Sequence, residues 1–193
     1  MESADTNTGA RTLPAEVWTI GHSTHPIEYF IEELVAYRIE ALVDVRRFPA
    51  SRRHPQFNAG ELDPSLAAVG IEYHHLPELG GRRQPRPDSP NTAWRNDSFR
   101  GYADYMETSE FRGGLERLLE LARDKRTAIM CAEAVWWRCH RALISDYLKA
   151  MGITVTHILS AAQSEPHPYT SAARIVDSRL SYHDPDQQAV LPL

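Results

Sequence analysis

The sequence predicts an α/β fold, a single three-layer domain built on a mainly parallel five-stranded sheet. Short apolar runs alternate with amphipathic stretches five times along the 193 residues. This alternation is typical of a parallel sheet that carries helices on both faces. Right-handed crossovers then favour a Rossmann-like strand order such as 3-2-1-4-5. A chain of this length buries enough apolar surface to fold without a covalent or metal staple.

Each predicted element follows from its local pattern. The strands are expected at residues 17–20, 41–45, 71–76, 127–130 and 154–159. The helices are expected at residues 26–38, 61–69, 102–108, 110–124 and 139–151. Pro26 suits a first helical turn, and Gly70 suits the position after a helix end. Leu115, Leu118 and Leu119 share one face of the fourth helix, which indicates that this face is buried.

The remaining segments divide the chain into three parts. Residues 1–14 are polar and are expected to form a disordered leader, residues 15–165 the α/β domain, and residues 166–193 a C-terminal tail. An Arg/Pro-rich insertion at about 77–100 is too polar for the core, and such insertions usually form a lid or a partner surface. A short helix near residues 171–178 is compatible with the composition of the tail.

Composition narrows the class of protein. No apolar run approaches the ~18 residues that a membrane span requires, so no membrane partner is expected. The polar start lacks the apolar region of a secretory signal, and the chain has only two cysteines. These features predict a cytoplasmic protein with reduced thiols. A net charge of −5 argues against a general duplex-DNA coat protein but leaves room for a local basic groove.

Titratable residues gather where the predicted strands end, which is the edge where parallel sheets bind ligands. The candidate catalytic residues are Cys131, Glu133, Asp44 and His22. Cys131 is a candidate nucleophile or metal ligand, and Glu133 and Asp44 are candidate general bases. His22 is a candidate hydrogen-bond donor to a bound anion or a candidate acid–base group. Each also has a structural interpretation: a small buried thiol, carboxylates that hold arginines, and a capping histidine.

Basic and aromatic residues near the same edge are candidates for substrate binding. They are Arg46, Arg47, Arg52, Arg53, Phe57, Asn58, Trp136, Trp137, Arg138 and Arg141. Guanidinium groups at a helix start bind phosphate, and aromatic rings stack on bases. Adjacent tryptophans usually divide, with one side chain buried and the other exposed. A solvated loop that binds nothing is the competing interpretation.

Several blocks of the sequence resemble one known family. These blocks are TIGHS (19–23), LVDVRRFP (42–49), FN (57–58), LGG (79–81), GYADYM (101–106) and MCAE (130–133) with CHR (139–141). They are similar to the family called domain of unknown function 488, and the similarity extends from about Val17 to Thr170. The resemblance implies an α/β domain of intracellular proteins. It implies no established activity.

Three functions fit these residues. The favoured hypothesis is an intracellular enzyme, a hydrolase or transferase, that acts on a phosphate-bearing nucleotide or nucleic acid at the Cys/Glu/Arg/Asp edge. The first alternative is a non-catalytic nucleotide- or nucleic-acid-binding module. The second is a metal-binding or redox protein that uses Cys131, Cys139 and His140, although Cys-x7-Cys-His is not a usual zinc spacing. These patterns require no cofactor, and they are compatible with a bound metal and with a homodimer. The sequence identifies neither the substrate nor the reaction.

Overall fold

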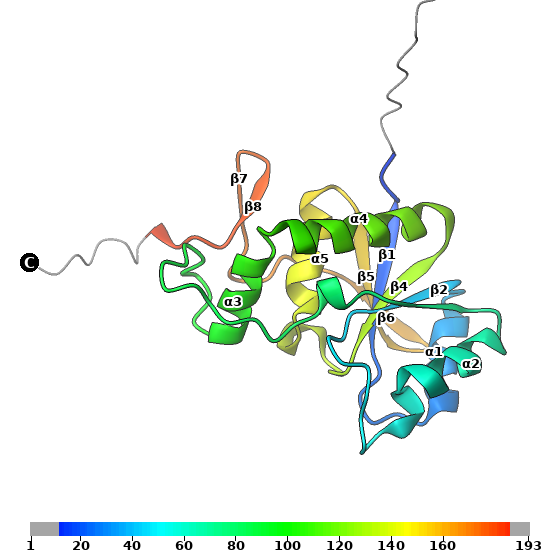
Figure 1. Cartoon of the computed structure of the whole chain (residues 1–193). Helices are drawn as coiled ribbons and strands as arrows, with labels where there is room; N and C mark the ends of the chain where they lie inside the picture. Colours follow the sequence, from blue (N-terminus) through cyan, green and yellow to red (C-terminus); the bar gives the residue numbers. More distant parts are fainter. Residues whose placement is uncertain (1–11, 186–193) are drawn as a thin grey trace, which may run out of the picture.

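The computed structural model describes residues 12–185, and it has a central sheet with helices on both faces (Figure 1). The strands of the sheet are β1 (Glu16–Gly21), β2 (Ala41–Asp44), β3 (Glu72–His75), β4 (Thr127–Cys131), β5 (Thr154–Ser160) and β6 (Gln163–Pro166). Their order is β3-β2-β4-β1-β5-β6. The first five strands pair in parallel, and β6 pairs antiparallel with β5. The predicted α/β class with a mainly parallel sheet is confirmed.

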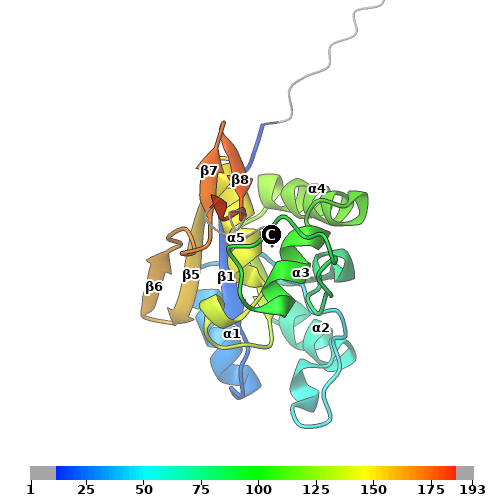
Figure 2. The ribbon, with the colours of Figure 1, turned by 90° about the vertical axis from the view of Figure 1, so that its left-hand side faces the viewer.

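The helices form the two outer layers. They are α1 (Ile27–Ala36), α2 (Ala59–Ala67), α3 (Asp97–Tyr105), α4 (Ser109–Asp124) and α5 (Arg141–Ala150). Buried side chains of α1 and α2 pack in one apolar cluster on one face of the sheet. Buried side chains of α3, α4 and α5 pack in a second cluster on the other face. Figure 2 shows α5 beside β1 and β5 in a view turned by 90°.

Strands β1 and β4 are buried on both faces, which explains why they read as continuous apolar runs. Successive side chains point to opposite faces of a strand. In β4, Met130 therefore packs with the α1/α2 cluster, whereas Ile129 and Cys131 pack with the α3/α4/α5 cluster. The same alternation in β1 places Ile20 with α1 and α2.

The strand order differs from the predicted 3-2-1-4-5, because β4 lies between β2 and β1 and a sixth strand is added at the edge. The register pairs Asp44 with Met130 and Gly21 with Cys131. Both central strands are almost entirely buried, so the alternation of elements does not reveal which one is next to β2. The chain leaves β1 and β2 toward α1 and α2 but leaves β4 toward α5. Cys131 therefore lies at a switch point, where ligand sites of α/β sheets occur.

The insertion and the tail both pack on the domain. Residues 77–100 contain the short 3₁₀ helix η2 (Pro77–Leu79) and lead into α3, which begins earlier than predicted because the Asn96 side chain accepts bonds from the first free N–H groups. Residues 171–178 do not form the expected helix, because β7 (Arg174–Val176) and β8 (Arg179–Ser181) form a hairpin there. Most of the expected leader lies outside the described residues.

Within residues 12–185, no helix has the length and apolar character needed to cross a membrane.

Candidate functional site

The two cysteines meet at the carboxyl end of β4. Cys131 ends β4, and Cys139 follows the 3₁₀ helix η3 (Trp136–Arg138), just before α5. Their Sγ atoms are 2.6 Å apart, and neither cysteine is in a disulfide. Only 2% of Cys131 and 4% of Cys139 is exposed. The fold therefore holds two free thiols in close contact and almost completely shields them from solvent.

Arg141, the first residue of α5, lies beside this pair and is 1% exposed. Its Nη1 donates to Thr19 Oγ1 (3.2 Å), and its Nη2 donates to the backbone carbonyls of Glu133 (2.7 Å) and Ala134 (3.4 Å). Its Nε has no hydrogen-bond partner. Among the residues that the structure describes, no carboxylate accepts a bond from this guanidinium. A buried cation requires compensating negative charge, and a thiolate of the sulfur pair is in a position to supply it.

The pKa values of the two thiols are shifted in opposite directions. Burial alone would raise the pKa of Cys139, but a hydrogen bond from Cys131 and the positive charge of Arg141 outweigh it and lower that pKa to about 7. The backbone N–H of Arg141 also donates to Cys139 Sγ (3.5 Å). Burial, together with its hydrogen bond to Cys139, raises the pKa of Cys131 well above its usual range. Cys139 is therefore the thiol of the pair that ionises first as pH rises, while Cys131 keeps its proton.

His140 contacts the same pair from the helix start. Its Nε2 is 3.1 Å from the carbonyl oxygen of Val45, and its Nδ1 is 3.4 Å from Cys139 Sγ. Burial lowers the pKa of His140, which favours the neutral ring. A neutral ring that donates from Nε2 to the carbonyl leaves Nδ1 as an acceptor. His140 Nδ1 is thus placed to accept a hydrogen bond from the Cys139 thiol.

Two glycines allow the backbone to approach this cluster closely. A Cβ atom on Gly21 would collide with the Glu133 carbonyl oxygen and would lie 2.8 Å from Arg141 Nη2. A Cβ atom on Gly81 would lie 2.8 Å from His140 Nδ1. These glycines belong to the TIGHS and LGG blocks of the sequence. Each block brings its backbone close to the cluster, Gly21 beside Arg141 and Gly81 beside His140.

A second cluster forms at the end of β2, around the predicted candidates Asp44 and Arg46. The carboxylate of Asp44, which is 0% exposed, accepts from Arg46 Nε (2.9 Å), Arg46 Nη2 (2.5 Å) and the hydroxyl of Tyr73 (2.7 Å). Arg46 also donates to the carbonyl of Phe57 (2.7 Å). Asp44 is thereby fully engaged in an internal ion pair, the structural interpretation that the sequence left open.

His22 belongs to both clusters. Its Nε2 lies 3.2 Å from Arg46 Nη1, its ring stacks on Phe57 (4.1 Å), and its backbone N–H donates to the Cys131 carbonyl (3.0 Å). Burial, followed by the charge of Arg46, lowers the pKa of His22 to about 4. The ring is therefore neutral near pH 7 and acts as an acceptor in the structure.

The other predicted residues divide between surface and core. Glu133, Arg47, Arg52, Arg53, Trp137 and Arg138 are exposed, and Asn58 is partly buried. Asn58 accepts from the backbone of Ser51 (2.5 Å) and thus holds the basic loop. Trp136 is buried and Trp137 is 53% exposed, the division expected for adjacent tryptophans. Glu133 contacts the sulfur cluster through its backbone: its N–H donates to Cys131 Sγ (3.4 Å), and its carbonyl accepts from Arg141 Nη2.

Sequence reasoning did not find a third cluster that adjoins Arg141. A buried chain of side chains connects Thr19 through His157 and His167 to Asp146. The available signal was the presence of polar residues within apolar surroundings: Asp146 on the buried face of α5 and His157 in the buried strand β5.

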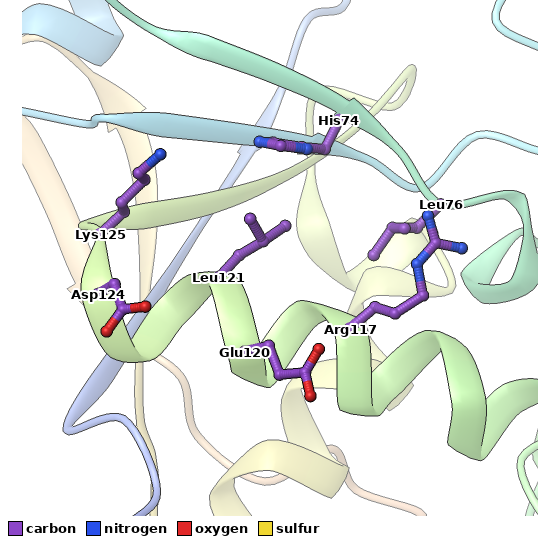
Figure 3. Close-up of a pocket in the computed structure, with 7 residues that line it drawn as sticks. All are labelled: His74, Leu76, Arg117, Glu120, Leu121, Asp124 and Lys125. Carbon is purple, nitrogen blue, oxygen red and sulfur yellow. The ribbon is translucent and has the colours of Figure 1, made fainter.

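The surface hollows lie elsewhere. One lies between α4 and the end of β3, and Figure 3 shows its lining residues: His74, Leu76, Arg117, Glu120, Leu121, Asp124 and Lys125. A second lies beside α2 and β3. Neither is lined by a residue of the sulfur cluster. Within residues 12–185, no group of three or more His, Cys, Asp or Glu side chains is arranged to hold a metal.

With this geometry established, comparison with known proteins places the chain in a family. Residues 26–148 match the family described as domain of unknown function DUF488. The chain belongs to this family. The resemblance seen in the sequence blocks is thereby confirmed, and the matched region includes α1 to α4, most of α5 and both cysteines of this DUF488 chain. No curated protein and no solved structure matches it.

Proposed function

We propose that this DUF488 chain is a thiol redox protein in which Cys139 and Cys131 are reversibly oxidised to a disulfide by a small hydroperoxide. One observation carries the proposal. The two sulfur atoms lie 2.6 Å apart beside a buried arginine that has no carboxylate partner among the described residues. This arrangement favours a thiolate, which is the reactive form of cysteine.

The proposed reaction balances in two steps. The Cys139 thiolate attacks the terminal oxygen of the hydroperoxide and the O–O bond breaks, which gives a sulfenic acid on Cys139 and an alkoxide that takes a proton from water. The Cys131 sulfur then attacks the Cys139 sulfur, and the S–O bond breaks. The Cys131 proton leaves with the hydroxide as water. Two electrons pass from the thiols to the peroxide, and a small-molecule dithiol returns them.

The burial of the pair favours a small oxidant. Exchange with a protein disulfide requires the attacking and attacked sulfurs to line up in an exposed mixed disulfide. Cys131 and Cys139 are 2% and 4% exposed, so a second protein cannot approach either sulfur without a large rearrangement. A hydroperoxide has only a few atoms and needs a much smaller opening.

The residue arrangement gives less support to the other two hypotheses. Arg141 is one of the guanidinium groups that the phosphate hypothesis invoked, and it donates instead to a hydroxyl and two carbonyls. The exposed Arg47, Arg52, Arg53 and Arg138 are still available to a phosphate-bearing ligand. A metal centre on Cys131, Cys139 and His140 gains no support from the arrangement, since in the described part of the chain no three His, Cys, Asp or Glu side chains are placed to hold a metal.

Single cysteine variants test the proposal. After brief treatment with hydroperoxide, the reduced wild-type protein should lose both free thiols and gain an intramolecular disulfide, seen by mass spectrometry and reversed by a dithiol reductant. Cys131→Ser should instead stop at a sulfenic acid on Cys139, which a sulfenic-specific probe labels. Cys139→Ser should do neither, although its far-ultraviolet circular dichroism should match that of the wild type.

Two outcomes would contradict the proposal. The first is a wild-type protein that keeps both thiols at peroxide concentrations that oxidise a simple thiolate. The second is labelling on Cys131 in the Cys139→Ser variant at the wild-type rate, because the electrostatics assign the reactive thiolate to Cys139.

A further inference from the structure

A continuous chain of hydrogen bonds runs through the core from Arg141 to Asp146. Arg141 Nη1 contacts Thr19 Oγ1 (3.2 Å), which contacts His157 Nδ1 (2.7 Å). His157 Nε2 contacts His167 Nδ1 (2.8 Å), and His167 Nε2 contacts Asp146 Oδ1 (3.0 Å). All five residues are at most 2% exposed. A connected and fully buried polar network of this length destabilises the folded state unless its polar groups have hydrogen-bond partners.

All the hydrogen bonds of this chain are donated in the same direction. Burial, followed by the charges of His167 and Arg141, lowers the pKa of His157 to about 2, so its ring is neutral. Arg141 can only donate, and the Thr19 hydroxyl both accepts from Arg141 and donates to His157 Nδ1. His157 then donates from Nε2 to His167, and His167 donates from Nε2 to Asp146. Every donor points away from the guanidinium and toward the carboxylate.

The far end of the chain is rigidly fixed. Asp146 accepts from the backbone N–H of Thr170 (2.9 Å), the hydroxyl of Thr170 (2.6 Å) and the hydroxyl of Tyr182 (2.9 Å). The ring of Trp136 stacks on His157 with centroids 4.4 Å apart and an angle of 6°. The position of Thr19 Oγ1 is therefore determined from two directions, by strand β1 and by the imidazole that accepts its proton.

We propose that Asp146, His167 and His157 are positioning residues that act through Thr19 to hold the Arg141 guanidinium against the sulfur pair. This inference rests on the proposed thiol function, which it deepens. The other contacts of the guanidinium are the carbonyls of Glu133 and Ala134, and both residues lie in an exposed loop. Thr19 is its contact on the rigid sheet, so the chain behind Thr19 keeps the guanidinium in place.

The sign of the effect separates positioning from simple electrostatics. The negative charge of Asp146, acting through space, disfavours a second negative charge on Cys139. Removal of that charge alone would therefore make the Cys139 thiol more acidic. If Asp146 instead keeps Arg141 in place, its removal makes the thiol less acidic, because the cation is then held less firmly near the sulfur.

A matched pair of variants at Thr19 provides the test. Thr19→Val keeps the shape of the side chain and removes the hydroxyl, whereas Thr19→Ser keeps the hydroxyl. The measurement is the pH dependence of thiolate ultraviolet absorbance in the reduced protein, with Cys139→Ser as baseline, and it needs no reagent to reach the sulfurs. We expect Thr19→Val to raise the midpoint by about one pH unit, a tenfold change in the ionisation constant, and Thr19→Ser to leave it near the wild-type value.

Asp146→Asn is the second variant, and it keeps the inference testable if Thr19→Val does not fold. Its midpoint should also rise. A midpoint that is unchanged or lower in Asp146→Asn, or equal in Thr19→Val and Thr19→Ser, would overturn the positioning role while leaving the thiol function intact. A wild-type protein without any thiolate that forms near pH 7 would overturn the proposed function itself, and with it this inference.

Discussion

Two buried arginines lie at the same edge of the sheet, and their surroundings differ. Arg46 forms an ion pair with the Asp44 carboxylate, whereas Arg141 donates to a hydroxyl and two carbonyls. Arg46 is thus neutralised locally and ties the basic loop to β2. Arg141 keeps its uncompensated charge beside Cys131 and Cys139. The same residue type is structural in one place and, in the proposed function, activates a thiol in the other, and the presence of a carboxylate makes the difference.

The largest effect that this comparison predicts is on folding, at Asp44. Asp44→Asn should lower the free energy of unfolding by about 3–5 kcal/mol, because it leaves the Arg46 cation buried without a partner. Urea unfolding at pH 7 measures this loss, and the thiolate titration of the surviving folded protein should not move. A loss below about 1 kcal/mol would show that the two arginines do not differ in the way described.

The next effect concerns ionisation, at Arg141. Arg141→Met should raise the midpoint of the Cys139 titration by about 1–2 pH units, because the cation that lowers the pKa of this thiol is removed. Its effect on the free energy of unfolding should be smaller than that of Asp44→Asn, since an unpaired thiolate can take up a proton. Arg46→Lys serves as the control and should leave the titration unchanged. An equal shift in both variants would contradict the assignment.

The smallest effect concerns a third buried charge, Glu33 on α1, which is 1% exposed. Burial, followed by the charge of Glu32, raises the pKa of Glu33 from its ordinary value to about 7. The folded state therefore binds this proton more tightly than the unfolded state, so its stabilising contribution is present at low pH and is lost as pH rises toward 7. Glu33→Gln should increase stability at pH 8 by about 1–3 kcal/mol and have little effect at pH 4. Urea unfolding at both pH values would contradict this if the two gains were equal.

The sequence predicted the class of fold and the edge at which its titratable residues gather, because both depend on local periodicity. It did not predict the position of β4 between β1 and β2, which depends on how two similarly buried strands fit their neighbours. It placed Asp44 and Cys131 near each other, but it could not show that Asp44 is fully bonded to Arg46 and Tyr73. The contact between Cys131 and Cys139 depends on the path of the loop that separates them, and no spacing rule describes that path.

The sulfur pair also has a consequence for the outer surface of the protein. Cys131 and Cys139 bracket a loop in which Glu133, Trp137 and Arg138 are exposed. A covalent bond between the sulfurs would turn this loop into a small closed ring and would reduce the conformations open to the Trp137 indole. In the proposed function, oxidation of two buried sulfur atoms would therefore restrict the motion of an aromatic side chain that is exposed on the surface, where a neighbouring molecule can contact it.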